Sequence, residues 1–148
     1  MRAKFINEAH GFERGANPLK NLNIGIRSQI INWLYSMSIK NYIINDDLTI
    51  DVNGSVNLSY KNLTHFPKFI KFNHVSGFFW CDHNQLISLE GCPKIIDGPF
   101  MCSDSYLENL DYFPEYVGDD LFLMRNKLTQ FTEEDIRNKC NVVGRVMI

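Results

Sequence analysis

The sequence predicts an α/β solenoid, in which about four stacked coils share a parallel sheet and a cap closes each end. Three observations lead to this fold class. A unit of 21 to 23 residues recurs from Gly54 onward, every unit keeps the same apolar positions, and apolar residues alternate with other residues where each unit begins. A single coil cannot cover its own apolar side, so the coils must stack on one another.

The repeat unit contains a strand and a return segment. Four copies begin at Gly54, Gly77, Gly98 and Asp119. The ninth position after each start is always Leu, while the second, fourth and twelfth positions are apolar or Cys. Alternate strand residues face opposite sides, so the second and fourth positions point into the core, which the ninth and twelfth also enter. We therefore expect parallel strands near 55–59, 78–82, 99–103 and 120–124.

Two features mark the chain between the strands. Asn84 and Asn126 occupy the seventh position of their copies, where an amide can hydrogen-bond the turning backbone, and Lys61 and Ser105 replace it elsewhere. Three prolines oppose long helices in the return segments: Pro67, Pro93 and Pro114. This pattern of apolar, Asn and Leu positions resembles the leucine-rich repeat over residues 52–131.

The flanking segments are expected to cap the open ends of the repeat core. Ile30 and Leu34 recur at helical spacing, and Asn53-Gly54 suits a hairpin turn into the first repeat strand. Thr132 followed by three acidic residues is typical of a helix start. One structural domain then has four parts: an N-terminal arm 1–25, a helix and strand cap 26–53, the solenoid 54–131 and a C-terminal helical cap 132–148.

Charge and cysteine usage limit the classes of partner. The formal net charge of -2 argues against nucleic acid, because phosphate binding needs a basic face. No run approaches the roughly 20 apolar residues that span a bilayer, and the first residues lack the long apolar run of a secretory signal. We expect no nucleic-acid or membrane partner and a cytoplasmic location. The cysteines have no zinc-like spacing, so buried free thiols are expected, with a disulfide or a metal site as alternatives. No cofactor and no metal is predicted.

Outward-facing strand residues form the predicted site. Neighbouring strands lie about 4.8 Å apart, so Trp80, Met101 and Phe122 should form one apolar row, with Phe78 and Met124 near its ends. Apolar patches with polar rims mark interfaces. The predicted partner-binding surface has seven residues: Phe78, Trp80, Asp82, Met101, Asp120, Phe122 and Met124.

An alternative is that an arm or cap covers this face. The strand-face residues would then form a second core, and binding would use the convex loops around Lys61, Glu90 and Glu108. Catalytic motifs such as a P-loop, a nucleophilic Ser elbow or HExxH are missing from the sequence. His83 could approach Cys81 or Asp82, but Cys81 stands in an inward column and is interpreted as a core thiol. We expect no enzymatic activity.

Short N-terminal motifs suggest a source. Phe12-Glu-Arg-Gly15, Pro18 and Ile24-Gly25 are similar to a leader shared by many small proteins of large tailed bacteriophages. Asn84-Gln-Leu86 and Gly91-Cys-Pro93 resemble segments of leucine-rich-repeat-like phage and bacterial proteins. The resemblance implies an inhibitor or adaptor of a host bacterial protein, including defence proteins, in the host cytosol.

The same resemblance leaves a second function open. Ile6-Asn-Glu8-Ala9 is similar to the signal of a phage head-maturation protease, which implies cleavage after Glu8. A chance tetrapeptide is the alternative. The competing hypothesis is therefore a structural or packaged virion or assembly protein, and a homo-oligomer fits either function.

Overall fold

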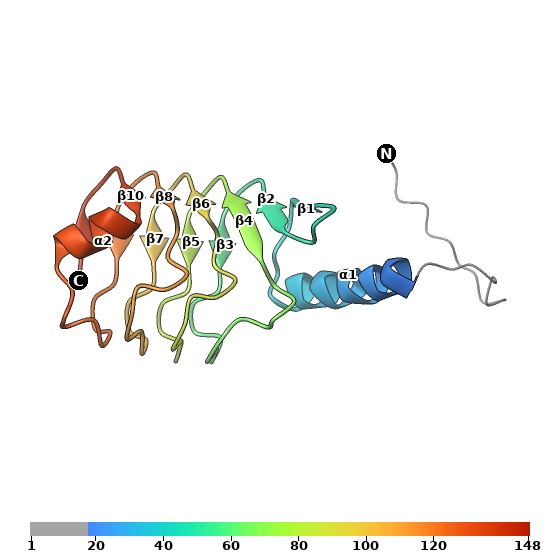
Figure 1. Ribbon diagram of the computed structural model, residues 1–148, viewed down its shortest axis with the longest axis horizontal. Coiled ribbons are helices and arrows are strands. Elements are labelled where there is room, and N and C mark those ends of the chain that lie inside the picture. Colours follow the sequence, from blue (N-terminus) through green and yellow to red (C-terminus); the bar gives the residue numbers. More distant parts are fainter. Residues whose placement is uncertain (1–17) are drawn as a thin grey trace.

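The computed structural model describes residues 18–148 and is a parallel-sheet β-solenoid of about four turns with two helices (Figure 1). Its elements follow in the order α1 (Pro18–Ser36), β1 (Tyr42–Ile44), β2 (Ile50–Val52), β3 (Val56–Asn57), β4 (Phe72–Val75), β5 (Phe79–Trp80), β6 (Ile95–Ile96), β7 (Phe100–Met101), β8 (Tyr116–Val117), β9 (Leu121–Phe122), α2 (Glu133–Lys139), β10 (Asn141–Val142) and β11 (Val146–Met147).

The strands form two sheets, whereas the sequence led us to expect one. Sheet A has the order β1-β2-β4-β6-β8-β10, and sheet B has the order β11-β9-β7-β5-β3. The predicted parallel pairing of the four repeat strands is confirmed in sheet B. Each coil also contributes a strand to sheet A, which ends two residues before the repeat start. The coil bends between these strands at the glycine column.

Close approach of neighbouring coils explains the glycine at this bend. The amide of Gly98 donates to the carbonyl of Gly77 at 3.0 Å. A Cβ added to Gly98 would lie 2.8 Å from the carbonyl carbon and oxygen of Gly77. Real Cβ atoms do not come this close to backbone, so a larger residue at Gly98 would push these two coils apart; the fourth copy has Asp119 at this position, directly after Gly118.

The core lies between the two sheets and the return segments. Its inward columns are closed: in the four predicted copies, no residue at the second or fourth repeat position is more than 1% exposed. Phe79 packs against Phe66, Phe72 and Phe100 with ring centroids 5.4 to 6.2 Å apart. The Leu column of the returns is buried from Leu86 onward. The repeat therefore identified most of the core, whereas Leu63 and Phe131, in its first and last copies, are only partly buried.

Side-chain amides hold the turn that follows sheet B. Asn84 is 6% exposed, and its Oδ1 accepts the amides of Lys61 and Leu63 from the preceding coil, each at 3.0 Å. Its Nδ2 donates to the carbonyls of Leu58 and Cys81, both at 2.9 Å. The predicted role of this Asn, pairing backbone groups at the turn, is confirmed.

The N-terminal end differs from the expected cap. α1 begins at Pro18, so residues 18–25, which we assigned to the arm, are helical; proline is well suited to a first helical position because no helical partner exists for its missing N–H. The predicted hairpin at Asn53-Gly54 is wrong. β1 and β2 form the hairpin instead, and β2 and β3 belong to different sheets. The rest of the predicted arm, with Glu8 and the motif at Phe12, lies outside the described residues.

The C-terminal segment extends the solenoid. α2 begins after Thr132, whose hydroxyl accepts the amide of Asp135, while the Asp135 carboxylate accepts the amide of Thr132. β10 and β11 then add one parallel strand to each sheet. Residues 132–148 are therefore a further coil that carries a helix in its return segment, where we expected a cap.

Candidate binding surface

The outward residues of sheet B form a continuous row across the solenoid. Register pairs join Asn57 with Trp80, Trp80 with Met101 and Met101 with Phe122, as the repeat predicted, and Met147 follows Phe122. All of these except Asn57 are apolar and partly exposed. We call Trp80, Met101, Phe122 and Met147 the apolar row. It remains more accessible than the core columns on the other side of the same strands.

Two other predicted residues flank the apolar row. Phe78 stacks on Trp80 with ring centroids 4.0 Å apart and planes 20° apart, so it widens the row beside Trp80. Met124 lies two residues beyond Phe122 and is also partly exposed. The sequence missed Met147, because its strand had been assigned to a cap.

The Asp82 carboxylate lies inside a hydrogen-bond network and differs from an exposed rim group. Asp82 is 6% exposed. Its Oδ1 accepts the hydroxyl of Ser59 at 2.5 Å, and its Oδ2 lies 2.6 Å from His83 Nδ1. The His83 ring also stacks on Tyr60, with centroids 4.3 Å apart. Asp82 therefore orients the border of the strand face, and its burial limits direct contact with a partner.

A second border runs along the turns after sheet B. His83, Asp104 and Arg125 occupy equivalent turn positions with φ between 53° and 55°, in the left-handed region. His83 Nε2 lies 3.4 Å from Asp104 Oδ2, and the Arg125 guanidinium binds both Asp104 oxygens. This hydrogen bonding from Arg125 holds the pKa of Asp104 below its usual value. The border is thus charged at neutral pH and lies beside the apolar row.

Asp120 is tied to the last coil at the opposite border. Arg145 donates its amide to Asp120 Oδ1 at 2.7 Å and its Nη2 to Oδ2 at 2.6 Å. The hydrogen bond from the Arg145 guanidinium lowers the pKa of the Asp120 carboxyl. Asp120, a predicted site residue, is therefore bonded to the last coil, which the sequence did not assign to the repeat.

Two buried polar atoms of the strand face have no hydrogen-bond partner: Trp80 Nε1 and Ser103 Oγ. No other buried side-chain nitrogen or oxygen between residues 18 and 148 is left in this state. Such atoms cost about 1–3 kcal/mol each. Buried polar atoms without a partner are expected mainly at functional sites, where the sequence is not optimised for stability.

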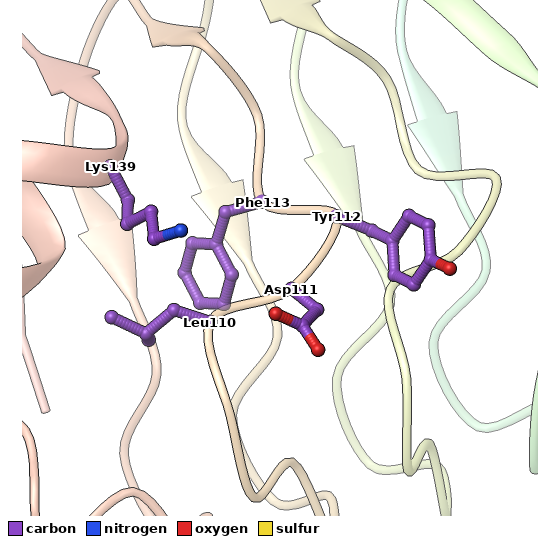
Figure 2. A pocket seen from close by; sticks show the side chains of 5 residues that line it. All are labelled: Leu110, Asp111, Tyr112, Phe113 and Lys139. Carbon is purple, nitrogen blue, oxygen red and sulfur yellow. The ribbon is translucent and has the colours of Figure 1, made fainter.

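A depression of about 410 Å³ lies on the return side, away from the predicted site residues (Figure 2). Leu110, Phe113 and Lys139 line it together with Asp111 and Tyr112. Lys139 and Phe113 point toward one another, whereas Tyr112 points away from both. This arrangement brings together neither a nucleophile with a base nor a set of convergent acids.

The four cysteines lie in the core as free thiols. Burial raises the pKa of the Cys81 and Cys92 thiols well above the usual value, and raises that of Cys140 to about 11. These groups are therefore protonated and poorly nucleophilic at neutral pH. Among residues 18–148, no three His, Cys, Asp or Glu side chains are placed to hold a metal ion.

Comparison with protein-family models, with curated proteins and with solved structures gave no match. In the part of the chain that the structure describes, no helix has the length and apolar character needed to cross a membrane.

A further apolar surface was not anticipated. α1 presents Ile24, Ile31 and Tyr35 to solvent with exposed fractions of 63%, 42% and 85%. The sequence signal was the seven-residue spacing between Ile24 and Ile31. It was missed because residues up to 25 had been assigned to an arm.

Proposed function

We propose that the protein is a non-catalytic, leucine-rich-repeat-like binding module that holds another protein on the outer face of sheet B. The observation that carries this proposal is the apolar row, a set of large side chains aligned by strand register and left partly exposed. A partner that covers the row removes this apolar surface from water. The charged borders around Asp104 and Asp120 then limit which orientation the partner takes.

Trp80 is the expected energetic anchor of the interface. The Phe78 ring stacks on its indole and enlarges the apolar surface there, and Met101 lies next to Trp80 in the row. Large aromatic side chains near the centre of an interface commonly contribute 2 kcal/mol or more, while their neighbours mainly exclude water.

The partner class rests on the resemblance to phage proteins. We propose a host bacterial protein, including a defence protein, that is inhibited or recruited in the bacterial cytosol. A structural or packaged virion protein is the competing function, and it would use the same face for contacts with capsid or assembly proteins.

Affinity capture with matched variants tests the binding face. Wild type, Trp80→Ala and Tyr116→Ala are used as bait in lysates of uninfected and infected bacteria. Tyr116 is a suitable control because it is a partly exposed aromatic residue in the outward row of sheet A. Calorimetry with the purified captured protein then gives the dissociation constant for each variant.

We expect Trp80→Ala to weaken binding about 30-fold, equivalent to about 2 kcal/mol, with little change in melting temperature. Tyr116→Ala should bind as wild type. Capture of one host protein supports the inhibitor or adaptor, whereas capture of capsid proteins supports the virion function. Equal binding by Trp80→Ala and wild type would contradict the assigned face, and unfolding of Trp80→Ala would place the ring in the core.

A further inference from the structure

Helix α1 has two apolar sides, one packed and one exposed. One side packs on the end of the solenoid through Ile30 and Leu34, which are fully buried. The other side carries Ile24, Ile31 and Tyr35, which we call the α1 stripe; their exposed fractions run from 42% to 85%. At 100° per residue, the centre of the stripe lies about 100° around the helix from the centre of the packed pair. The stripe therefore leaves apolar surface uncovered within the described molecule.

The place of α1 leaves the stripe open to another molecule. The helix extends from the β1–β2 end of the solenoid, and residues 18–25 are all exposed (Figure 1). Because Ile30 and Leu34 fix the packed side to the solenoid, the stripe cannot turn toward the apolar row of its own chain. Any cover for the stripe among the surfaces described here must come from a second copy.

The apolar row has the dimensions to receive this stripe. Ile24 and Tyr35 are eleven residues apart, which corresponds to about 16.5 Å along a helix. Trp80 and Met147 are separated by three strand spacings, or about 14 Å. Within the stripe, Ile31 and Tyr35 are about 6 Å apart along the helix and Ile24 and Ile31 about 10.5 Å, which is close to one and two strand spacings of about 4.8 Å.

Charge favours the same pairing. α1 contains Lys20 and Arg27 and no acidic residue, and Arg27 is also bonded within its own chain, to the carbonyls of Ile44 and Asn45 and beside Asp46. The borders of the strand face contain more acids than bases: Asp82, Asp104, Asp119 and Asp120 against Arg125 and Arg145. A basic helix is therefore attracted to this face, mainly through faster association and orientation. The affinity itself would come from the apolar contacts.

From the two open apolar surfaces and their opposite charge we infer that the protein associates with itself, with the α1 stripe of one copy on the apolar row of the next. The contact joins two different surfaces, so repeated contacts give a chain or a closed ring. This inference does not depend on the proposed function, although both use the apolar row. A foreign partner would compete with α1, so self-association would decrease when the partner binds.

Complementation between two blocked variants is the decisive experiment. The first variant, Ile24→Asp with Ile31→Asp, blocks the stripe while leaving Ile30 and Leu34 unchanged. The second, Phe122→Asp, blocks the row. Ile87→Asp is the control, because Ile87 is 60% exposed on a return segment and belongs to neither surface. Circular dichroism melting establishes that each variant is folded before its mass is measured by light scattering.

The inferred contact predicts a specific set of masses. Wild type and Ile87→Asp should rise above the 17.2 kDa of one chain as concentration increases from about 10 to about 500 µM, a range that brackets weak protein contacts. Each blocked variant alone should remain a single chain. Their equimolar mixture should form a dimer and nothing larger, because one intact stripe and one intact row are left.

Three outcomes would overturn the inference. The first is a wild type that stays monomeric over the whole range, and the second is association that survives either set of substitutions. The third is a mixture without dimers although wild type associates, which indicates contact between identical surfaces. If Phe122→Asp does not fold, Met101→Asp replaces it as the row variant in the same test. Loss of foreign-partner capture with intact self-association would count against the proposed function alone.

Discussion

The outer rows of the two sheets have the same register and different chemistry. In sheet A polar and apolar residues share the row, which runs through Ile43, Asp51, His74, Ile95, Tyr116 and Asn141. Its polar groups are paired: Asn73 donates to Asp51 Oδ1 at 2.8 Å, and His74 Nε2 lies 2.8 Å from Asp97. In sheet B the corresponding row is apolar and carries the unpartnered Trp80 Nε1.

This contrast separates the demands of the fold from those of function. Both sheets are stacked by the same backbone ladder and share one core, so the fold is satisfied by either outer surface. In the row of sheet A, polar side chains separate the apolar ones, because Asp51 and His74 lie between Ile43 and Ile95. The apolar row of sheet B has no corresponding structural reason, and this difference directs attention to it as the binding surface.

The largest expected effect concerns the shared core, where the difference between the sheets should vanish. Leu86→Ala removes a side chain that is fully buried beneath both sheets and should lower the free energy of unfolding by about 2–5 kcal/mol. Chemical denaturation measures this loss. Ile87→Ala, at the adjacent residue with 60% exposure, is the control and should change stability by about 0.5 kcal/mol or less. Similar losses for both variants would show that the Leu column does not fill the core.

The next effect concerns the turn that leaves sheet B. Asn84→Ala removes the acceptor for the amides of Lys61 and Leu63 and should cost about 1–3 kcal/mol. Hydrogen exchange should show faster exchange at these two amides than at the amide of Leu107, which is bonded to Asn126. Unchanged exchange at Lys61 would mean that another group supports the turn.

A smaller pair of effects tests the two outer rows directly. Asp51→Ala breaks the hydrogen bond from Asn73 and should lower stability by about 0.5–1.5 kcal/mol without changing protein binding or self-association. Met101→Ala should do the reverse, with weaker association and a stability change of about 0.5 kcal/mol or less. Denaturation and light scattering on both variants provide the comparison. Equal behaviour of the two variants in both measurements would remove the functional distinction between the sheets.

The smallest effect is electrostatic. Since the Arg145 guanidinium lowers the pKa of Asp120 below 3.8, the interaction stabilises the fold above that pH and is lost as pH falls through the lowered pKa. Arg145→Gln should raise the Asp120 pKa toward its usual value, as measured by NMR titration. The pKa of Asp135, lowered by hydrogen bonds from Thr132, should not move. A shift of both carboxyls would indicate a general change in structure.

Much of the fold was predictable because the core columns recur at fixed positions. Comparing the spacing of these columns could also have identified the last coil. Val142, Gly144, Val146 and Ile148 repeat the spacing of Ile96, Gly98, Phe100 and Cys102, but the longer segment with α2 hides the period. Sheet A was missed because only one inward column recurs in its strands, at Val52, Val75, Ile96 and Val117, so no apolar alternation marks them in every copy.

The candidate surface was only partly predictable for a different reason. Register places Trp80, Met101 and Phe122 side by side once the repeat is known. Side-chain contacts across coils, such as those of Asp82 with Ser59 and of Asp120 with Arg145, depend on rotamers that the repeat does not specify. The exposed stripe of α1 depends on which side of the helix packs, and the sequence has apolar residues on more than one side, as at the adjacent Ile30 and Ile31.

The stacked glycine bend also makes the length of this protein adjustable in whole coils. The 21 residues from Gly98 to Gly118 contain one strand of each sheet and end where the next bend begins. A tandem duplication of this segment in the gene would insert a complete coil whose inward columns meet their own equivalents on both sides. It would also lengthen the apolar row by one methionine, about 4.8 Å. Unequal recombination could therefore change the reach of the surface in discrete steps, while the sequence of the core stays the same.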